Sequence, residues 1–129
     1  NGFTNLQTQG TLYKILVSSK SNTLYRQVEN ILTDDIYCTV ANGDLVQIMS
    51  KNATKWNGIC AMLEALNISK TETVYFGDDN DDIEPIQMCG AGVAVANAIE
   101  TVISEADYVA GSNDEDGVAR FIEGKVLSN

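Results

Sequence analysis

The sequence contains no histidine. Histidine is the most common side chain for acid–base catalysis near neutral pH and the most common metal ligand. Its absence excludes the serine–histidine and cysteine–histidine catalytic arrangements and most zinc sites. Any catalytic or binding chemistry therefore has to come from other side chains.

Basic residues are also scarce. Eight Lys and Arg stand against 18 Asp and Glu, which gives a formal net charge of −10. This balance argues against binding nucleic acid or an anionic membrane through bulk charge. It does not exclude a phosphorylated small molecule, because a bound metal ion and a lysine can reverse the field at one site.

Cysteines are few, and long apolar runs are absent. Cys38, Cys60 and Cys89 are widely spaced and form no CxxC pair, which predicts buried free thiols in a reducing compartment. No apolar run approaches the length of a transmembrane helix, and no signal peptide is visible. We therefore expect a cytoplasmic protein that does not insert into a membrane.

The order of expected elements divides the chain in two. The expected strands are 12–17, 36–41, 45–49, 74–76, 92–96 and 108–110. The expected helices are 23–32, 55–66, one beginning at Glu84-Pro85, 97–106 and 117–124. Residues 1–49 read as an α+β module whose hairpin turns at Asn42-Gly43. Residues 50–129 alternate helix and strand, which predicts α/β architecture with a parallel sheet.

Four carboxylates follow the expected strand 74–76 and Gly77, namely Asp78, Asp79, Asp81 and Asp82. Mg²⁺ is commonly held by one or two carboxylates together with substrate phosphate. Ligands of open α/β sheets bind outside the carboxyl ends of the strands. The pattern predicts a divalent-cation site at the edge of the sheet, with Asp78 and Asp82 as the first candidates. A solvated acidic loop is the alternative.

Two other ligand-binding motifs, the EF-hand loop and the dinucleotide-binding fingerprint, do not match residues 78–95. An EF-hand loop starting at Asp78 would need glycine where Ile83 stands and glutamate where Cys89 stands. The glycines of Gly90-Ala91-Gly92 precede a strand, and Val95 occupies the last position of a dinucleotide-binding fingerprint. A tight turn explains these glycines better.

Lys55 is a candidate phosphate ligand at the start of an expected helix. A lysine there can bind a phosphoryl oxygen and offset carboxylate repulsion. On residue type alone, an ordinary surface lysine is the more common case, and Lys51 is a rival for the role.

The run 77–98, GDDNDDIEPIQMCGAGVAVANA, resembles the fourth motif of haloacid dehalogenase-like (HAD) hydrolases. It is most similar to Cof-type phosphatases, whose pattern is GD-x-x-ND-I-x-M-L followed by small residues and NA. The matching positions are Gly77, Asp78, Asp82, Ile83, Gly90, Gly92, Ala94, Asn97 and Ala98. The tail 106–123 resembles the end of such chains, and Lys55 stands where the family has its motif-three lysine. The resemblance implies the second half of a HAD Rossmann-like parallel-sheet core, residues 50–129, preceded by the C-terminal part of an α+β cap domain, residues 1–49.

The resemblance also implies an activity. HAD phosphatases are Mg²⁺-dependent phosphomonoester hydrolases that act on small phosphorylated metabolites through an aspartyl-phosphate. The nucleophile is a motif-one aspartate, and a second aspartate two residues later acts as general acid and base. By this likeness Asp78 and Asp82 hold the metal, and Asp79 and Asp81 make secondary metal or phosphate contacts. Lys55 stabilises charge on nucleophile and phosphate, and the cap closes over the site and selects the substrate.

The sequence departs from the family pattern in ways that matter. Asp81 stands where asparagine is usual, and Pro85 where methionine is frequent. No DxDGT-like motif one occurs in the chain, and the motif-two serine or threonine is missing. We therefore expect the C-terminal fragment of a longer phosphatase, inactive alone. Its half-core would expose an open sheet edge and an apolar face, which another copy or the missing N-terminal portion would cover.

A second function class stays open. The chain is alternatively a non-catalytic acidic module that binds a divalent cation or a partner. A motif-one sequence upstream in the coding frame would favour the phosphatase. The sequence does not select among sugar phosphates, pyridoxal phosphate and nucleotides as substrates.

Overall fold

The computed structural model describes residues 13–18, 23–41 and 45–128. The described residues fall into two compact units, one up to Ala53 and the other from Thr54 onward. The expected turn at Asn42-Gly43 and the start of the first expected strand lie outside the described residues. In the part of the chain that the structure describes, no helix is both long and apolar enough to cross a membrane.

The first unit contains an antiparallel sheet with strand order β1-β3-β2. Its elements are β1 (Ile15–Ser18), α1 (Leu24–Glu29), β2 (Ile36–Ala41) and β3 (Leu45–Ser50). Ile48 of β3 lies in register between Ile15 and Cys38, so these three residues share one face of the sheet. Helix α1 packs on β2, and Val28 of α1 and Val46 of β3 are buried.

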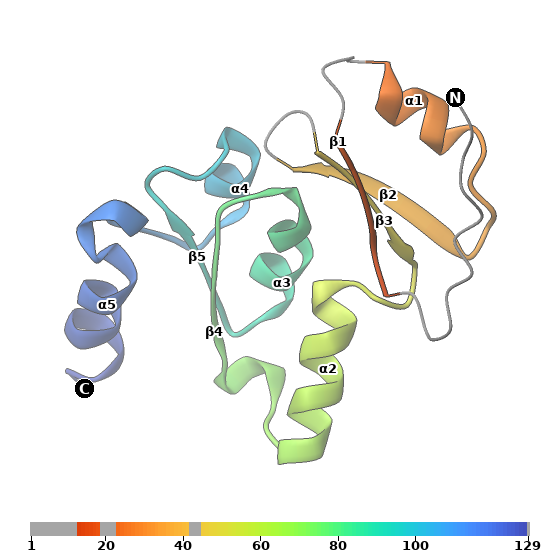
Figure 1. Ribbon diagram of the computed structural model, residues 1–129. Coiled ribbons are helices and arrows are strands. Elements are labelled where there is room, and N and C mark those ends of the chain that lie inside the picture. The colour runs from red at the N-terminus through yellow and green to blue at the C-terminus, as the bar shows by residue number, and fades with distance from the viewer. Residues whose placement is uncertain (1–12, 19–22, 42–44, 129) are drawn as a thin grey trace. The chain divides into compact units, whose positions relative to one another are not determined.

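The second unit is built on a parallel sheet with strand order β4-β5-β6, which confirms the α/β prediction. Its helices and strands are α2 (Lys55–Leu66), β4 (Val74–Gly77), α3 (Ile83–Met88), β5 (Ala91–Val95), α4 (Glu100–Glu105), β6 (Tyr108–Ala110) and α5 (Gly117–Phe121). Short 3₁₀ turns precede β4, α3 and α5. Helix α2 packs against α3 (Figure 1).

Strand alternation assigns the two faces of this sheet. Tyr75 points to the face covered by α3 and α4, where Ile86, Ala94 and Val102 are buried together. Phe76 points the other way, and its ring meets that of Phe121 from α5 edge-on at 5.6 Å. Figure 1 accordingly shows α5 and α3 on opposite sides of β4.

Helix α4 is shorter than the sequence predicts, and the reason is tertiary. The expected helix covered 97–106, but α4 begins only at Glu100. The backbone N–H of Ile99 donates to the carbonyl of Asp78 at 3.0 Å, and that of Ala98 donates to Val95 at 2.9 Å. These contacts tie the chain to the ends of β4 and β5, and Ile99 keeps an extended backbone (φ −64°, ψ 150°), so the helix starts after it.

Smaller corrections concern the other helix ends and one thiol. Helix α3 begins at Ile83, one residue before the predicted start, and α5 passes at Ile122 into a π-helical turn that ends at Val126. Cys60 is exposed, so the prediction of a buried thiol is wrong there; Cys38 and Cys89 are half-buried, and all three are free.

Gly58 offers a test of helix α2. A Cβ added at Gly58 would meet nothing within 4 Å, and alanine is preferred over glycine in a helix interior. We expect Gly58→Ala to raise the free energy of unfolding by about 0.5–1 kcal/mol. Urea denaturation followed by circular dichroism measures it, and a lower midpoint than that of the parent chain would contradict the open space around Gly58.

Candidate active site

The candidate site lies at the carboxyl end of β4. The strand ends at Gly77, and Asp78 and Asp79 lead into a 3₁₀ turn (Asn80–Asp82) from which α3 continues. Oδ1 of Asp79 accepts the backbone N–H of Asn80 at 2.7 Å and so caps this turn. The turn brings Asp82 back beneath the end of the strand.

Asp82 is buried, with 2% of its surface exposed, and both carboxylate oxygens are hydrogen-bonded. Oδ2 accepts the backbone N–H groups of Asp78 at 2.9 Å and of Asp79 at 3.2 Å. Oδ1 accepts the hydroxyl of Tyr75 at 2.7 Å and the ammonium of Lys55. Since a carboxylate offers about four acceptor positions, these donors use its full capacity.

Lys55 reaches Asp82 from the first turn of α2. Thr54 caps this helix by accepting the backbone N–H of Asn57 at 3.1 Å, so Lys55 is the first helical residue. The Lys55 side chain is 47% exposed, whereas that of Asp82 is 3% exposed. The ammonium therefore lies between a buried carboxylate and solvent, with donors left for a further anion.

Gly77 makes the close packing of Asp82 feasible. A Cβ at Gly77 would lie 2.4 Å from the Cβ of Asp82 and 2.9 Å from its carboxylate carbon. No side chain fits there without displacing Asp82. The glycine of this motif is thus required by close approach.

The contacts perturb three pKa values. Burial by itself raises the pKa of Asp82, but hydrogen bonds from Lys55, the Asp78 backbone, Tyr75 and the Asp79 backbone outweigh it, and the net pKa is lowered. Burial, and then the hydrogen bond to Asp82, raise the pKa of Tyr75, so its hydroxyl remains a donor. Partial desolvation and the adjacent Asp82 charge raise the pKa of Asp78.

The four predicted carboxylates have different surroundings. Asp82 is buried, Asp78 is exposed, and Asp79 and Asp81 are half-buried. Among the described residues, no group of three or more His, Cys, Asp or Glu side chains lies close enough to hold a metal ion. Because it is the exposed member of the four, Asp78 is the carboxylate of this cluster that is most open to a ligand.

Two residues that organise this end of the sheet were given no role by the sequence, although Asn97 is one of the positions that match the motif. Tyr75 carried no signal beyond strand alternation, yet its hydroxyl binds Asp82. Oδ1 of Asn97 accepts the hydroxyl of Ser112 at 3.2 Å and the backbone N–H of Asn113 at 3.1 Å. Asn97 thus ties the loop after β5 to the loop after β6, which spacing alone could not indicate.

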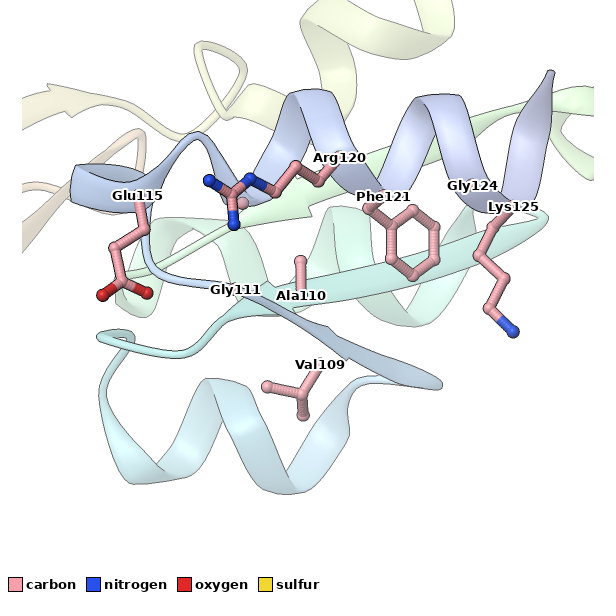
Figure 2. A pocket seen from close by; sticks show the side chains of 9 residues that line it. Val109, Ala110, Gly111, Glu115, Arg120, Phe121, Gly124 and Lys125 are labelled. Carbon is pink, nitrogen blue, oxygen red and sulfur yellow. The ribbon is translucent and has the colours of Figure 1, made fainter. Parts of the chain in front are cut away.

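A separate cavity of about 280 Å³ lies between β6 and α5 (Figure 2). Figure 2 shows Glu115, Arg120, Phe121 and Lys125 among its lining side chains. It shares no residue with the cluster of Lys55, Tyr75 and Asp82. All three charged residues of its lining are exposed, whereas the buried carboxylate and its four donors lie at the end of β4. We therefore place the candidate active site at the end of β4.

The fold and this site define a parallel-sheet α/β protein with a lysine–carboxylate pair at the end of a strand. The chain belongs to the haloacid dehalogenase-like hydrolase family, whose model matches residues 4–122. This confirms the resemblance of the run 77–98.

Individual relatives agree with this assignment. The chain is 32% identical over 118 residues to the putative phosphatase YxeH of Bacillus subtilis, covering 89% of this chain and 44% of that protein. It is 34% identical over 113 residues to the 5-amino-6-(5-phospho-D-ribitylamino)uracil phosphatase YbjI of Escherichia coli, covering 84% and 41%. A solved haloacid dehalogenase-like hydrolase from B. subtilis superposes with a TM-score of 0.83 at 27% identity, covering 93% and 44%. The chain spans less than half the length of the curated relatives it matches.

Proposed function

We propose that this chain supplies part of the active site of a Mg²⁺-dependent phosphatase that hydrolyses a small phosphorylated metabolite through an aspartyl-phosphate. The observation that carries the proposal is the ion pair of Lys55 with buried Asp82, next to exposed Asp78 at the end of β4. Relatives named as phosphatases support the reaction class.

Lys55 is the proposed phosphate ligand. Its ammonium is held by Asp82 on one side and is half-exposed on the other. An ammonium carries three donors, so it can hold Asp82 and still donate to a phosphoryl oxygen. Charge that builds up on that oxygen during phosphoryl transfer strengthens this contact, which is how a fixed cation accelerates the reaction.

The chemistry of the donor set fits Mg²⁺ in part. Mg²⁺ takes oxygen ligands and typically keeps several waters beside one or two carboxylates and a phosphate. Asp78 is exposed and suits a direct ligand; Asp82, whose oxygens already accept four donors, contributes its charge and holds the turn. Asp79 and Asp81 are proposed as secondary contacts. When bound, the ion would neutralise negative charge on phosphate and nucleophile.

The nucleophile is proposed to come from outside these 129 residues, because the chain has no DxDGT-like run. Residues 1–49 would then be the end of a cap domain and 50–129 half of the core, in a cytoplasmic enzyme. Among the described strands β4 pairs only with β5, so its other edge is open. Another copy or an N-terminal portion would cover that edge.

Phosphate release from a generic aryl phosphate tests the proposal. The 129-residue chain is compared with the same chain extended by the residues encoded upstream, each with and without Mg²⁺. We expect turnover only by the extended protein, and a fall of about 100-fold in kcat on Lys55→Ala. Lys51→Ala, which removes the rival lysine, serves as the matched control and should leave kcat unchanged.

Two outcomes would contradict the proposal. Turnover by the short chain would mean that another carboxylate within it is the nucleophile. No turnover by either protein would favour the non-catalytic module that binds a cation or a partner.

A further inference from the structure

Tyr75 shares one oxygen of Asp82 with Lys55. Its hydroxyl donates to Oδ1 at 2.7 Å, and the ammonium of Lys55 binds the same atom. The other oxygen, Oδ2, is held by the backbone of Asp78 and Asp79. Tyr75 is therefore the only side chain besides Lys55 among the donors described for this carboxylate.

The ring of Tyr75 is anchored by the sheet and the core. Tyr75 pairs in register with Gly92 of β5, so its backbone is fixed within the parallel sheet. Its ring is half-buried and packs against the cluster of Ile86, Ala94 and Val102. A tyrosine side chain has few rotatable bonds, so its hydroxyl is presented to Asp82 from an almost fixed point.

The ammonium of Lys55, by contrast, stands on a flexible four-carbon stem and is half-exposed. The terminal torsion of an aspartate is broad and roughly two-fold, so a carboxylate needs donors on both oxygens to hold its plane. The backbone N–H groups hold Oδ2, and the Tyr75 hydroxyl is the rigid donor on Oδ1. The acceptor position that Tyr75 leaves free on Oδ1 then determines where the ammonium of Lys55 lies.

We propose that Tyr75 is a positioning residue, which orients Asp82 so that Lys55 is held in one place for the phosphoryl group. The proposal rests on the proposed phosphatase function of Lys55. In this role Tyr75 acts through Asp82 on Lys55, without a contact of its own to substrate or metal.

The first test is the motion of Lys55 in the 129-residue chain and needs no activity. Nitrogen relaxation of lysine ammonium groups, in mildly acidic buffer where their protons exchange slowly, reports side-chain order. We expect Lys55 to be more ordered than Lys51, and Tyr75→Phe to reduce its order to that of Lys51. Tyr108→Phe is the matched control, because Tyr108 is an exposed tyrosine of β6 whose ring contacts Phe121 instead. Unchanged order of Lys55 in Tyr75→Phe would overturn the proposal.

The second test uses the kinetics of the upstream-extended protein. Tyr75→Phe should lower kcat about 10-fold and change KM less than about 2-fold, because a misplaced cation loses more in the transition state than in the ground state. Introduced into Lys55→Ala, the same change should lower kcat less than about 2-fold, because Tyr75 would have no ammonium left to position. Tyr108→Phe should alter neither constant.

The outcomes separate the two proposals. An equal loss of kcat from Tyr75→Phe with and without Lys55 would mean a structural effect and would overturn the positioning role. Ordered Lys55 that loses its order in Tyr75→Phe, in a protein that releases no phosphate, would support the positioning role and contradict the phosphatase.

Discussion

Asp82→Asn is expected to lower the free energy of unfolding by about 3 kcal/mol, because it leaves buried donors without an acceptor. The isosteric amide keeps the volume of the side chain but replaces one carboxylate oxygen by an N–H donor. Whichever way the amide turns, that donor faces either the two backbone N–H groups or the donors from Tyr75 and Lys55.

The ion pair itself is expected to contribute little of this loss. The Lys55 side chain is half-exposed, and solvent screens such pairs. The cost comes mainly from the donors that face the amide N–H group, which are either the hydroxyl of Tyr75 or the N–H groups of Asp78 and Asp79.

Urea denaturation of both proteins measures the difference. Asp114→Asn is the matched control, since Asp114 is an exposed carboxylate in the loop after β6, and it should change stability by less than about 0.5 kcal/mol. A loss smaller than about 1 kcal/mol for Asp82→Asn would contradict the view that this carboxylate holds the turn.

Gly92→Ala is expected to destabilise the second unit by about 2–3 kcal/mol through overpacking. Gly92 is buried in β5, and a Cβ there would lie 2.2 Å from the carbonyl oxygen of Ile86 in α3. This atom belongs to the backbone and cannot rotate away, so either the helix or the strand has to move. Because α3 continues directly from the turn that carries Asp82, such a shift also disturbs the candidate site.

Gly58→Ala provides the matched control, because it is the same substitution in a helix with open space around it. The two variants should move the urea midpoint in opposite directions, down for Gly92→Ala and up for Gly58→Ala. Equal midpoints would mean that β5 and α3 tolerate a larger separation than their packing indicates.

The sequence is enough to predict the parallel sheet of the second unit and to point to its candidate site. Alternating helix and strand signals predicted the parallel sheet, because such crossovers bury the faces of a sheet. The carboxylates after Gly77 marked the end of β4, and Lys55 was identified by its place in the motif pattern. Tertiary contacts then joined Lys55 to Asp82 across 27 residues of chain.

The differences among the carboxylates arise from tertiary contacts. Asp78 and Asp82 are the same residue type, and their spacing in the sequence makes both of them candidate metal ligands. Asp82 turns inward because Gly77 leaves room for it and because four donors from separated parts of the chain converge on its oxygens. The roles of Tyr75 and of the shortened helix α4 were likewise hidden, because both depend on partners distant in sequence. Local patterns report periodicity and turns, whereas the choice of hydrogen-bond partner is made when the strands and helices pack together.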